Sequence, residues 1–239
     1  MQARRAMRRG VDEMKAWAQV ISLAMLIGGS GCHDLERSRD VGDASVPGKT
    51  IALQVCSNCH GLKGISVSPA FPKLAGQPRE YLVAQLTDFK THARSDPNAK
   101  RFMWGFTHLT DAQIGDIATY FSSQPAVVGE SVDPALMNAG REIYLSGLPA
   151  KGVAACVACH GQHGEGLDKF PRLGGQHADY VIKQLRVFQR TTDRPRGELM
   201  KAVCANMSDD DMRAVAAFVE AFPADGVAPT QEAKSAAAQ

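Results

Sequence analysis

The stretch VCSNCHGLKG, Val55–Gly64, has two cysteines separated by two residues and a histidine directly after the second. A second stretch, CVACHG, repeats this CxxCH pattern about a hundred residues later. The motif residues are Cys56, Cys59 and His60 in the first copy and Cys156, Cys159 and His160 in the second. Three chemistries use thiols paired in this way: a disulfide redox pair, half of a zinc site, and covalent attachment of heme.

The histidines distinguish these alternatives. Two CxxC pairs would give zinc four thiolates, but they leave the histidine after each pair without a role. A thioredoxin-like redox pair is usually framed by a strand, a helix and a strand, and the sequence shows no such pattern. Heme attachment uses every residue, because the thiols bond to the porphyrin vinyl groups and the adjacent imidazole binds the iron. The two motifs therefore predict two covalently attached heme c groups.

The duplication extends well beyond the cysteines. The segment FPKLAGQPREYLVAQLTDF, Phe71–Phe89, recurs as FPRLGGQHADYVIKQLRVF, Phe170–Phe188. Further on, LTDAQIGDIATYF, Leu109–Phe121, pairs with MSDDDMRAVAAFV, Met207–Val219. Repetition over this length predicts two similar structural units. The second unit also carries an insertion, SGLPAKG, before its CxxCH motif.

The periodicity of both units is helical. Thr110 and Ser208 each precede an amphipathic segment and are followed three residues later by Gln113 or Asp211, which is typical of a capped helix start. No segment alternates as a strand would. We therefore predict an all-α fold in which a few short helices of each unit wrap around one covalently bound heme. The expected boundaries are 42–124 and 134–223 for the two domains, 125–133 for a linker and 224–239 for a disordered tail.

From about Gly42 to Phe222 the chain resembles the diheme class I cytochromes c of the cytochrome c4 type. The resemblance rests on the paired CxxCH motifs, the paired FPxLxGQxxxYxxxQL segments and a methionine ahead of each capped terminal helix. It implies two tandem class I cytochrome c domains whose hemes lie close together across a domain interface. It also implies an electron carrier rather than an enzyme.

The expected sixth iron ligands are two methionines. Met103 is the only methionine between His60 and the linker, and Met200 occupies the corresponding place in the second unit, where it resembles the family's axial methionine. Met207 and Met212 are expected to be packing residues. A thioether ligand favours reduced iron and so raises the reduction potential relative to two histidine ligands.

Other histidines are rival ligands. We expect His92, His163 and His177 to be solvated loop or surface residues, while His108 stays open. Pro72 and Pro171 follow the motif histidines by twelve and eleven residues. This spacing resembles the class I pattern in which the proline carbonyl accepts the second imidazole N–H.

Several polar residues allow two interpretations. The repeated Tyr81 and Gln85, with their counterparts Tyr180 and Gln184, either reach heme propionates or the domain interface, or simply pack between helices. The basic segment 90–101 is either a solvated loop or a surface that steers an acidic redox partner.

The N-terminus predicts export. MKAWAQVISLAMLIGGSGC, Met14–Cys32, has a lysine, a short apolar run and small residues before a cysteine, so residues 1–31 read as an export signal with Met14 as an alternative start. Two outcomes fit: lipidation of Cys32, which would tether the protein to the membrane, or ordinary cleavage that leaves it soluble. Either outcome places the mature protein in the periplasm. We expect Cys204, near Met200, to be a buried apolar residue.

Charge excludes one class of function. Removing residues 1–31, which carry five Lys/Arg and two Asp/Glu, changes the net charge from +2 to −1, so nucleic-acid binding has no electrostatic support. We expect an electron carrier of a respiratory chain, with a quinol-oxidising complex as donor and a terminal oxidase as acceptor. The alternative is the heme-bearing subunit of a dehydrogenase or of a sulfur-compound-oxidising complex. A diheme peroxidase would need an open iron site, against which Met103 and Met200 argue.

Overall fold

The structure is a computed structural model that describes residues 37–129 and 134–222. Within these ranges the chain forms helices and two isolated bridges, and no β-strand. The predicted export signal with Met14 and Cys32, residues 130–133 of the predicted linker, and the predicted tail 224–239 lie outside the described residues. None of the described helices is long and apolar enough to cross a membrane.

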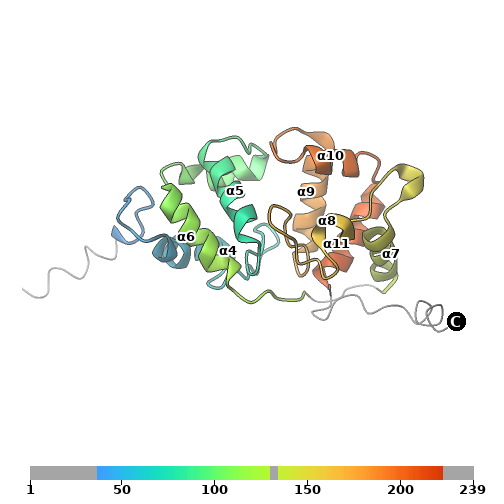
Figure 1. The fold of residues 1–239 in the computed structure, drawn as a ribbon, viewed down its shortest axis with the longest axis horizontal. Coiled ribbons are helices and arrows are strands. Elements are labelled where there is room, and N and C mark those ends of the chain that lie inside the picture. Colours follow the sequence, from blue (N-terminus) through green and yellow to red (C-terminus); the bar gives the residue numbers. More distant parts are fainter. Residues whose placement is uncertain (1–36, 130–133, 223–239) are drawn as a thin grey trace, which may run out of the picture.

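Two helical domains lie side by side (Figure 1), as the sequence predicted. The first contains α3 (Gly48–Ile51), η1 (Ala52–Cys56), α4 (Ser57–His60), α5 (Arg79–Lys90), η2 (Ala99–Met103), η3 (Trp104–Phe106) and α6 (Asp111–Ser122). The second contains α7 (Pro134–Ser146), η4 (Pro149–Lys151), α8 (Val157–His160), α9 (Ala178–Arg190), α10 (Glu198–Cys204) and α11 (Asp209–Glu220).

The terminal helices begin with the predicted caps. The Thr110 hydroxyl accepts the Gln113 backbone N–H while the Gln113 side chain accepts that of Thr110, and Ser208 and Asp211 form the same reciprocal pair at α11. Such a box satisfies backbone donors that a helix start otherwise leaves exposed. The capped starts fix where the two terminal helices enter the core.

In each domain the terminal helix crosses the first helix at a glycine. A Cβ on Gly140 of α7 would lie 2.1 Å from the Ala214 carbonyl oxygen of α11, and a Cβ on Gly48 would lie 2.4 Å from the Gln113 carbonyl oxygen. Only a residue without a side chain allows this approach. Met212 in α11 is fully buried and Met207 nearly so, which confirms their predicted packing role.

The domains are joined by a reciprocal pair of glutamines from the repeated FPxLxGQ segments. Gln77 accepts the Arg172 backbone N–H at 2.9 Å and donates to the Arg172 carbonyl at 2.8 Å. Gln176 does the same with Lys73, at 2.9 Å for both bonds. Both glutamines are only 5% exposed, so the two units dock through main-chain groups that are about a hundred residues apart in sequence.

His177 corrects one expectation, because it is not a solvated surface residue. Its Nε2 lies 2.9 Å from the Ser66 carbonyl of the first domain, and its Nδ1 lies 3.5 Å from the Glu220 carboxylate at the end of α11. It therefore belongs to the domain interface. Pattern alone could not distinguish this role, since a histidine beside a loop looks the same in sequence whether or not another domain covers it.

Candidate heme-binding site

Each CxxCH motif ends a helix that a glycine terminates. His60 is the last residue of α4 and is followed by Gly61, which has a φ of 79°; His160 of α8 is followed by Gly161, with a φ of 86°. A Cβ on Gly61 would also lie 2.3 Å from the Ile65 carbonyl oxygen. The chain can thus reverse immediately after the histidine and return beneath its ring.

The returning loop orients the imidazole. The Nδ1 of His60 lies 2.8 Å from the Pro72 carbonyl oxygen, and the Nδ1 of His160 lies 2.9 Å from that of Pro171. A carbonyl only accepts, so Nδ1 carries the proton and Nε2 keeps its lone pair. Fixing a ring in this way through its second nitrogen is how proteins orient an imidazole that binds a metal.

Burial disfavours the charged forms of the histidine and of the first cysteine in each motif. It lowers the pKa of His60 and of His160, and the hydrogen bond to each proline carbonyl opposes that shift. Burial also raises the pKa of the Cys56 thiol to about 12 and that of Cys156 to about 11. At neutral pH the imidazoles are thus neutral and suited to bind a metal, and the thiols of Cys56 and Cys156 are protonated.

Both motifs open onto one cavity of about 540 Å³ that is lined by residues of both domains. Its predicted site residues are Cys56, Cys59, His60, Pro72 and Met103 from the first domain and Cys156, Cys159, His160, Pro171 and Met200 from the second. Most of the other lining side chains are aliphatic or aromatic. A largely apolar cavity with paired thiols, neutral imidazoles and thioethers fits a large apolar macrocycle that carries iron.

The other histidines among the described residues do not compete for this cavity. Of the histidines that the structure describes, only His60 and His160 line it. His92 stacks on the Trp104 ring at a centroid distance of 4.2 Å, and His108 and His163 are exposed. All three methionines line the cavity. Met103 ends η2 and Met200 lies within α10, and Met207 is a buried member of the hydrophobic core.

A zinc site is not supported. Among the described residues no group of three or more cysteine, histidine or acidic side chains is placed to hold a metal ion. The first pair spans the end of η1 and α4 in the first domain, and the second pair spans the N-cap of α8 and α8 itself in the second domain. The arrangement therefore favours two one-imidazole sites over one four-thiolate site.

A tyrosine holds the chain just beyond each motif, but from a different helix in each domain. The Tyr120 hydroxyl of α6 donates to the Leu62 carbonyl at 2.7 Å, and the Tyr144 hydroxyl of α7 donates to the Gly161 carbonyl at 2.6 Å. The repeat equivalents of these tyrosines are Phe218 and Ala52, respectively. A tyrosine hydroxyl thus holds the segment just after the histidine in both domains, but it comes from opposite sides of the helix crossing and bonds to carbonyls one position apart.

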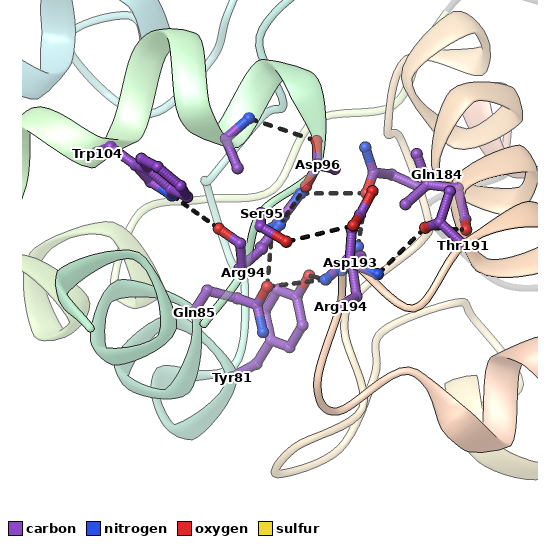
Figure 2. A network of polar contacts seen from close by, with 12 residues as sticks. Tyr81, Gln85, Arg94, Ser95, Asp96, Trp104, Gln184, Thr191, Asp193 and Arg194 are labelled. Carbon is purple, nitrogen blue, oxygen red and sulfur yellow. Dashed lines mark hydrogen bonds and ion pairs between the residues drawn. The ribbon is translucent and has the colours of Figure 1, made fainter. Parts of the chain in front are cut away.

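A buried polar network joins the domains (Figure 2), and several of its residues line the cavity. Arg94 donates to Gln85 at 2.8 Å and to Gln184 at 3.1 Å. Arg194 donates to the same two glutamine oxygens, at 2.8 and 2.7 Å, and lies 3.3 Å from the Tyr81 hydroxyl. The repeated glutamines and Tyr81 therefore lie at the interface, one of the two interpretations that their pattern allowed.

The sequence did not predict the arginines. Arg94 was expected in a solvated or steering loop, but it is 5% exposed and pairs with the fully buried Asp96 at 2.9 Å. The only sequence signal was an arginine nine or ten residues after each repeated glutamine, Gln85 and Gln184. The two repeats are out of register by one residue there, which hides the correspondence.

One donor of this network has no partner in the described structure. The Nε2 of Gln184 is buried without a hydrogen bond. Gln184 also lines the cavity, together with Arg94 and Arg194. A negatively charged hydrogen-bond acceptor on a bound group, such as a carboxylate, would accept a hydrogen bond from Gln184 Nε2. It would also pair with the neighbouring guanidinium groups.

Comparison with known proteins agrees with this geometry. The cytochrome c family model matches residues 45–125 and 139–222. Cytochrome c4 of Pseudomonas aeruginosa is 37% identical over 205 residues, covering 84% of this chain and 96% of that protein. The crystal structure of reduced recombinant cytochrome c4 from Pseudomonas stutzeri superposes with a TM-score of 0.67 at 39% identity, covering 76% of this chain and 100% of that one. A thiosulfate dehydrogenase electron acceptor of Stutzerimonas stutzeri is 34% identical over 178 residues, covering 72% of this chain and 80% of that protein.

Proposed function

Because this chain belongs to the cytochrome c family, as a diheme electron carrier like cytochrome c4, we propose that it carries electrons in the periplasm from a quinol-oxidising complex to a terminal oxidase. The observation that carries this proposal is the duplicated site: two neutral imidazoles, each fixed by a proline carbonyl, face one cavity shared by the domains. Two sites of one kind in one cavity suit electron transfer between two centres.

The two cysteine pairs imply two covalently bound hemes. In the proposed assignment Cys56 and Cys59 hold one and Cys156 and Cys159 the other. The axial ligands are His60 with Met103 in the first domain and His160 with Met200 in the second. Pro72 and Pro171 accept the second imidazole N–H. When bound, each group supplies an iron that cycles between its ferric and ferrous states.

The protein's own part is to keep these centres in place with little rearrangement. The proline carbonyls fix the imidazole planes, and the apolar lining excludes water, which disfavours the extra positive charge of oxidised iron. The buried donors at the interface, above all Gln184 Nε2, suit the carboxylates at the heme edge. A carrier whose geometry is the same in the oxidised and the reduced state gives and receives electrons without breaking bonds.

We also propose the domain boundaries 42–124 and 134–223, with residues 1–31 removed on export. Cys32 then either carries lipid, which would hold the carrier close to membrane complexes, or carries none, which would leave the protein soluble. Mass spectrometry of the mature N-terminus separates the two.

A second candidate function follows from one relative, the protein named as a thiosulfate dehydrogenase electron acceptor. In that case the donor is a sulfur-compound-oxidising enzyme rather than a quinol-oxidising complex. The heme chemistry is the same, so only the partner distinguishes the two functions.

The ligand assignment is tested by substituting Met103→Ala and Met200→Ala separately in the heme-loaded protein. Each change should lower the reduction potential of one heme, abolish its sulfur-to-iron absorption band and leave the other heme unchanged. Met212→Leu, a buried packing change away from the cavity lining, serves as the control. If both hemes kept their potentials and bands in either alanine variant, that methionine would not be a ligand.

The partner is tested in two assays, one that starts from the reduced protein and one that starts from the oxidised protein. Rapid reoxidation by oxidase-containing membranes, with slow reduction by thiosulfate and a thiosulfate dehydrogenase, supports the respiratory role. The reverse pattern supports the second candidate, and failure of the membranes to reoxidise the protein overturns the first.

A further inference from the structure

The loops that carry the two axial methionines touch each other across the domain interface. In the first domain the loop follows α5 and leads through η2 to Met103; in the second it follows α9 and leads into α10 with Met200. The Ser95 backbone N–H donates to the Asp193 carbonyl at 2.8 Å, and the Ser95 hydroxyl lies 3.3 Å from the Asp193 carboxylate (Figure 2). The contact is thus between the loops themselves.

Arg94 is the centre of the first loop. Its backbone N–H donates to the Asp88 carbonyl at 3.0 Å, and its own carbonyl accepts the indole N–H of Trp104, the neighbour of Met103, at 2.9 Å. Its side chain reaches Gln184 of the other domain at 3.1 Å. Any movement of Arg94 would therefore change both its hydrogen bond to Trp104, beside Met103, and its hydrogen bond to the second domain.

Asp96 connects the same loop to the start of η2. Its carboxylate is fully buried, pairs with Arg94 at 2.9 Å and accepts the Ala99 backbone N–H at 3.4 Å. Its carbonyl accepts the Lys100 N–H at 3.0 Å. The five-residue η2 ends at Met103, and its first residue is thus bonded to the Arg94–Asp96 ion pair, which faces the second domain.

The second loop is held by the first domain in turn. Arg196 donates to the carboxylate of Asp88 on α5 at 3.0 Å, and the Asp88 side chain is 7% exposed. One residue later the chain enters α10: the Gly197 N–H donates to the Arg194 carbonyl at 2.9 Å, and the Lys201 N–H donates to the Gly197 carbonyl at 2.7 Å. The first turn of the Met200 helix therefore rests on residues anchored in the other domain.

We propose that these two loops form one positioning unit for both axial methionines, so that a change in one domain's side of the interface loosens the methionine–iron bond of the other domain. The proposal rests on the assignment of Met103 and Met200 as ligands. Asp88 and Asp193 are positioning residues in it: neither lines the cavity, and each holds the loop of the opposite domain.

The physical basis is conformational freedom. A single thioether holds its loop to the iron weakly, so the strength of that bond depends on how much freedom the loop loses on binding. Interdomain hydrogen bonds remove part of that freedom in advance. Weakening them should favour any external ligand that competes with the methionine.

The test uses the full, heme-loaded ferric protein and titration with imidazole, which displaces a weakly held methionine. Bands of the two hemes are assigned with the Met103→Ala and Met200→Ala variants. Asp88→Asn, a change in the first domain, should tighten imidazole binding at the second heme about fivefold, on the scale of one weakened hydrogen bond. Asp193→Ala, in the second domain, should tighten it about threefold at the first heme.

Asp111→Asn is the matched control, because it removes the same charge from the first domain at an exposed side chain. The ion pair that it weakens, with Lys90 at 2.9 Å, lies within the first domain. It should change neither heme. Imidazole binding within twofold of wild type at the second heme of Asp88→Asn would overturn the proposal, as would equal changes in Asp111→Asn. If the wild-type protein itself lacked a methionine band, the ligand assignment would fail first, and that outcome is visible before any interface variant is made.

Discussion

Gln77→Met removes one half of the reciprocal glutamine pair and leaves the side-chain volume nearly unchanged. Two hydrogen bonds are lost, from Gln77 to the N–H and the carbonyl of Arg172, at 2.9 and 2.8 Å. Each backbone group left buried without a partner costs about 1–3 kcal/mol. The neighbouring gap of about 10 Å³ is barely large enough for one water, so little of this cost is recovered.

Because two backbone groups lose their partner, we expect a loss of about 2–6 kcal/mol in the free energy of unfolding, which for a protein of this size corresponds to a fall in Tm of about 4–24 °C. The measurement is thermal unfolding of the heme-loaded protein followed by circular dichroism at several wavelengths. Gln162→Met, at an exposed position of the second domain, is the control and should leave Tm unchanged. A Tm within about 1 °C of wild type would show that the pair does not hold the domains together.

Three further perturbations follow from the fold. Thr110→Ala and Ser208→Ala should each lower the free energy of unfolding by about 1 kcal/mol in denaturant titrations, because each removes a helix cap; unchanged midpoints would contradict the cap assignment. Gly140→Ala should cost at least about 3 kcal/mol or prevent stable folding, since its Cβ would lie 2.1 Å from a carbonyl oxygen, whereas Gly105→Ala meets open space and should be neutral; equal stability of the two variants would refute the crossing. Cys204 is fully buried and burial raises its pKa to about 12, so its thiol should resist iodoacetamide at pH 8 until the protein is unfolded; alkylation of the folded protein would be the opposite result.

The parts of the fold that the sequence predicted are those set by local chemistry or by repetition. A CxxCH motif needs only one helical turn, and a cap such as Thr110 with Gln113 needs only four residues, so both could be predicted from short stretches. Comparison of the two repeats then placed Met103 and Met200, which do line the cavity with the motif histidines. Their bonds to iron stay predictions.

The domain interface could not be predicted in the same way. Arg94 was expected in a solvated segment and His177 on the surface, yet both contact residues of the other domain that are ninety or more positions away in sequence. Such contacts have no periodicity, and they depend on how two finished units dock. The one-residue shift between Arg94 and Arg194 removed the last clue that repetition could have given.

The exchanged tyrosines carry a consequence for recombination between the repeats. A chimera that joined the first helix of one repeat to the terminal helix of the other would bring Ala52 together with Phe218, and no hydroxyl would then reach the carbonyl beyond the histidine. The opposite chimera would bring Tyr144 and Tyr120 to the same crossing, with two hydroxyl groups where each natural repeat has one. Because the tyrosine lies on a different helix in each repeat, the helices of the two repeats are not interchangeable. Unequal crossover between the repeats would therefore yield proteins defective in the segment that follows the CxxCH histidine.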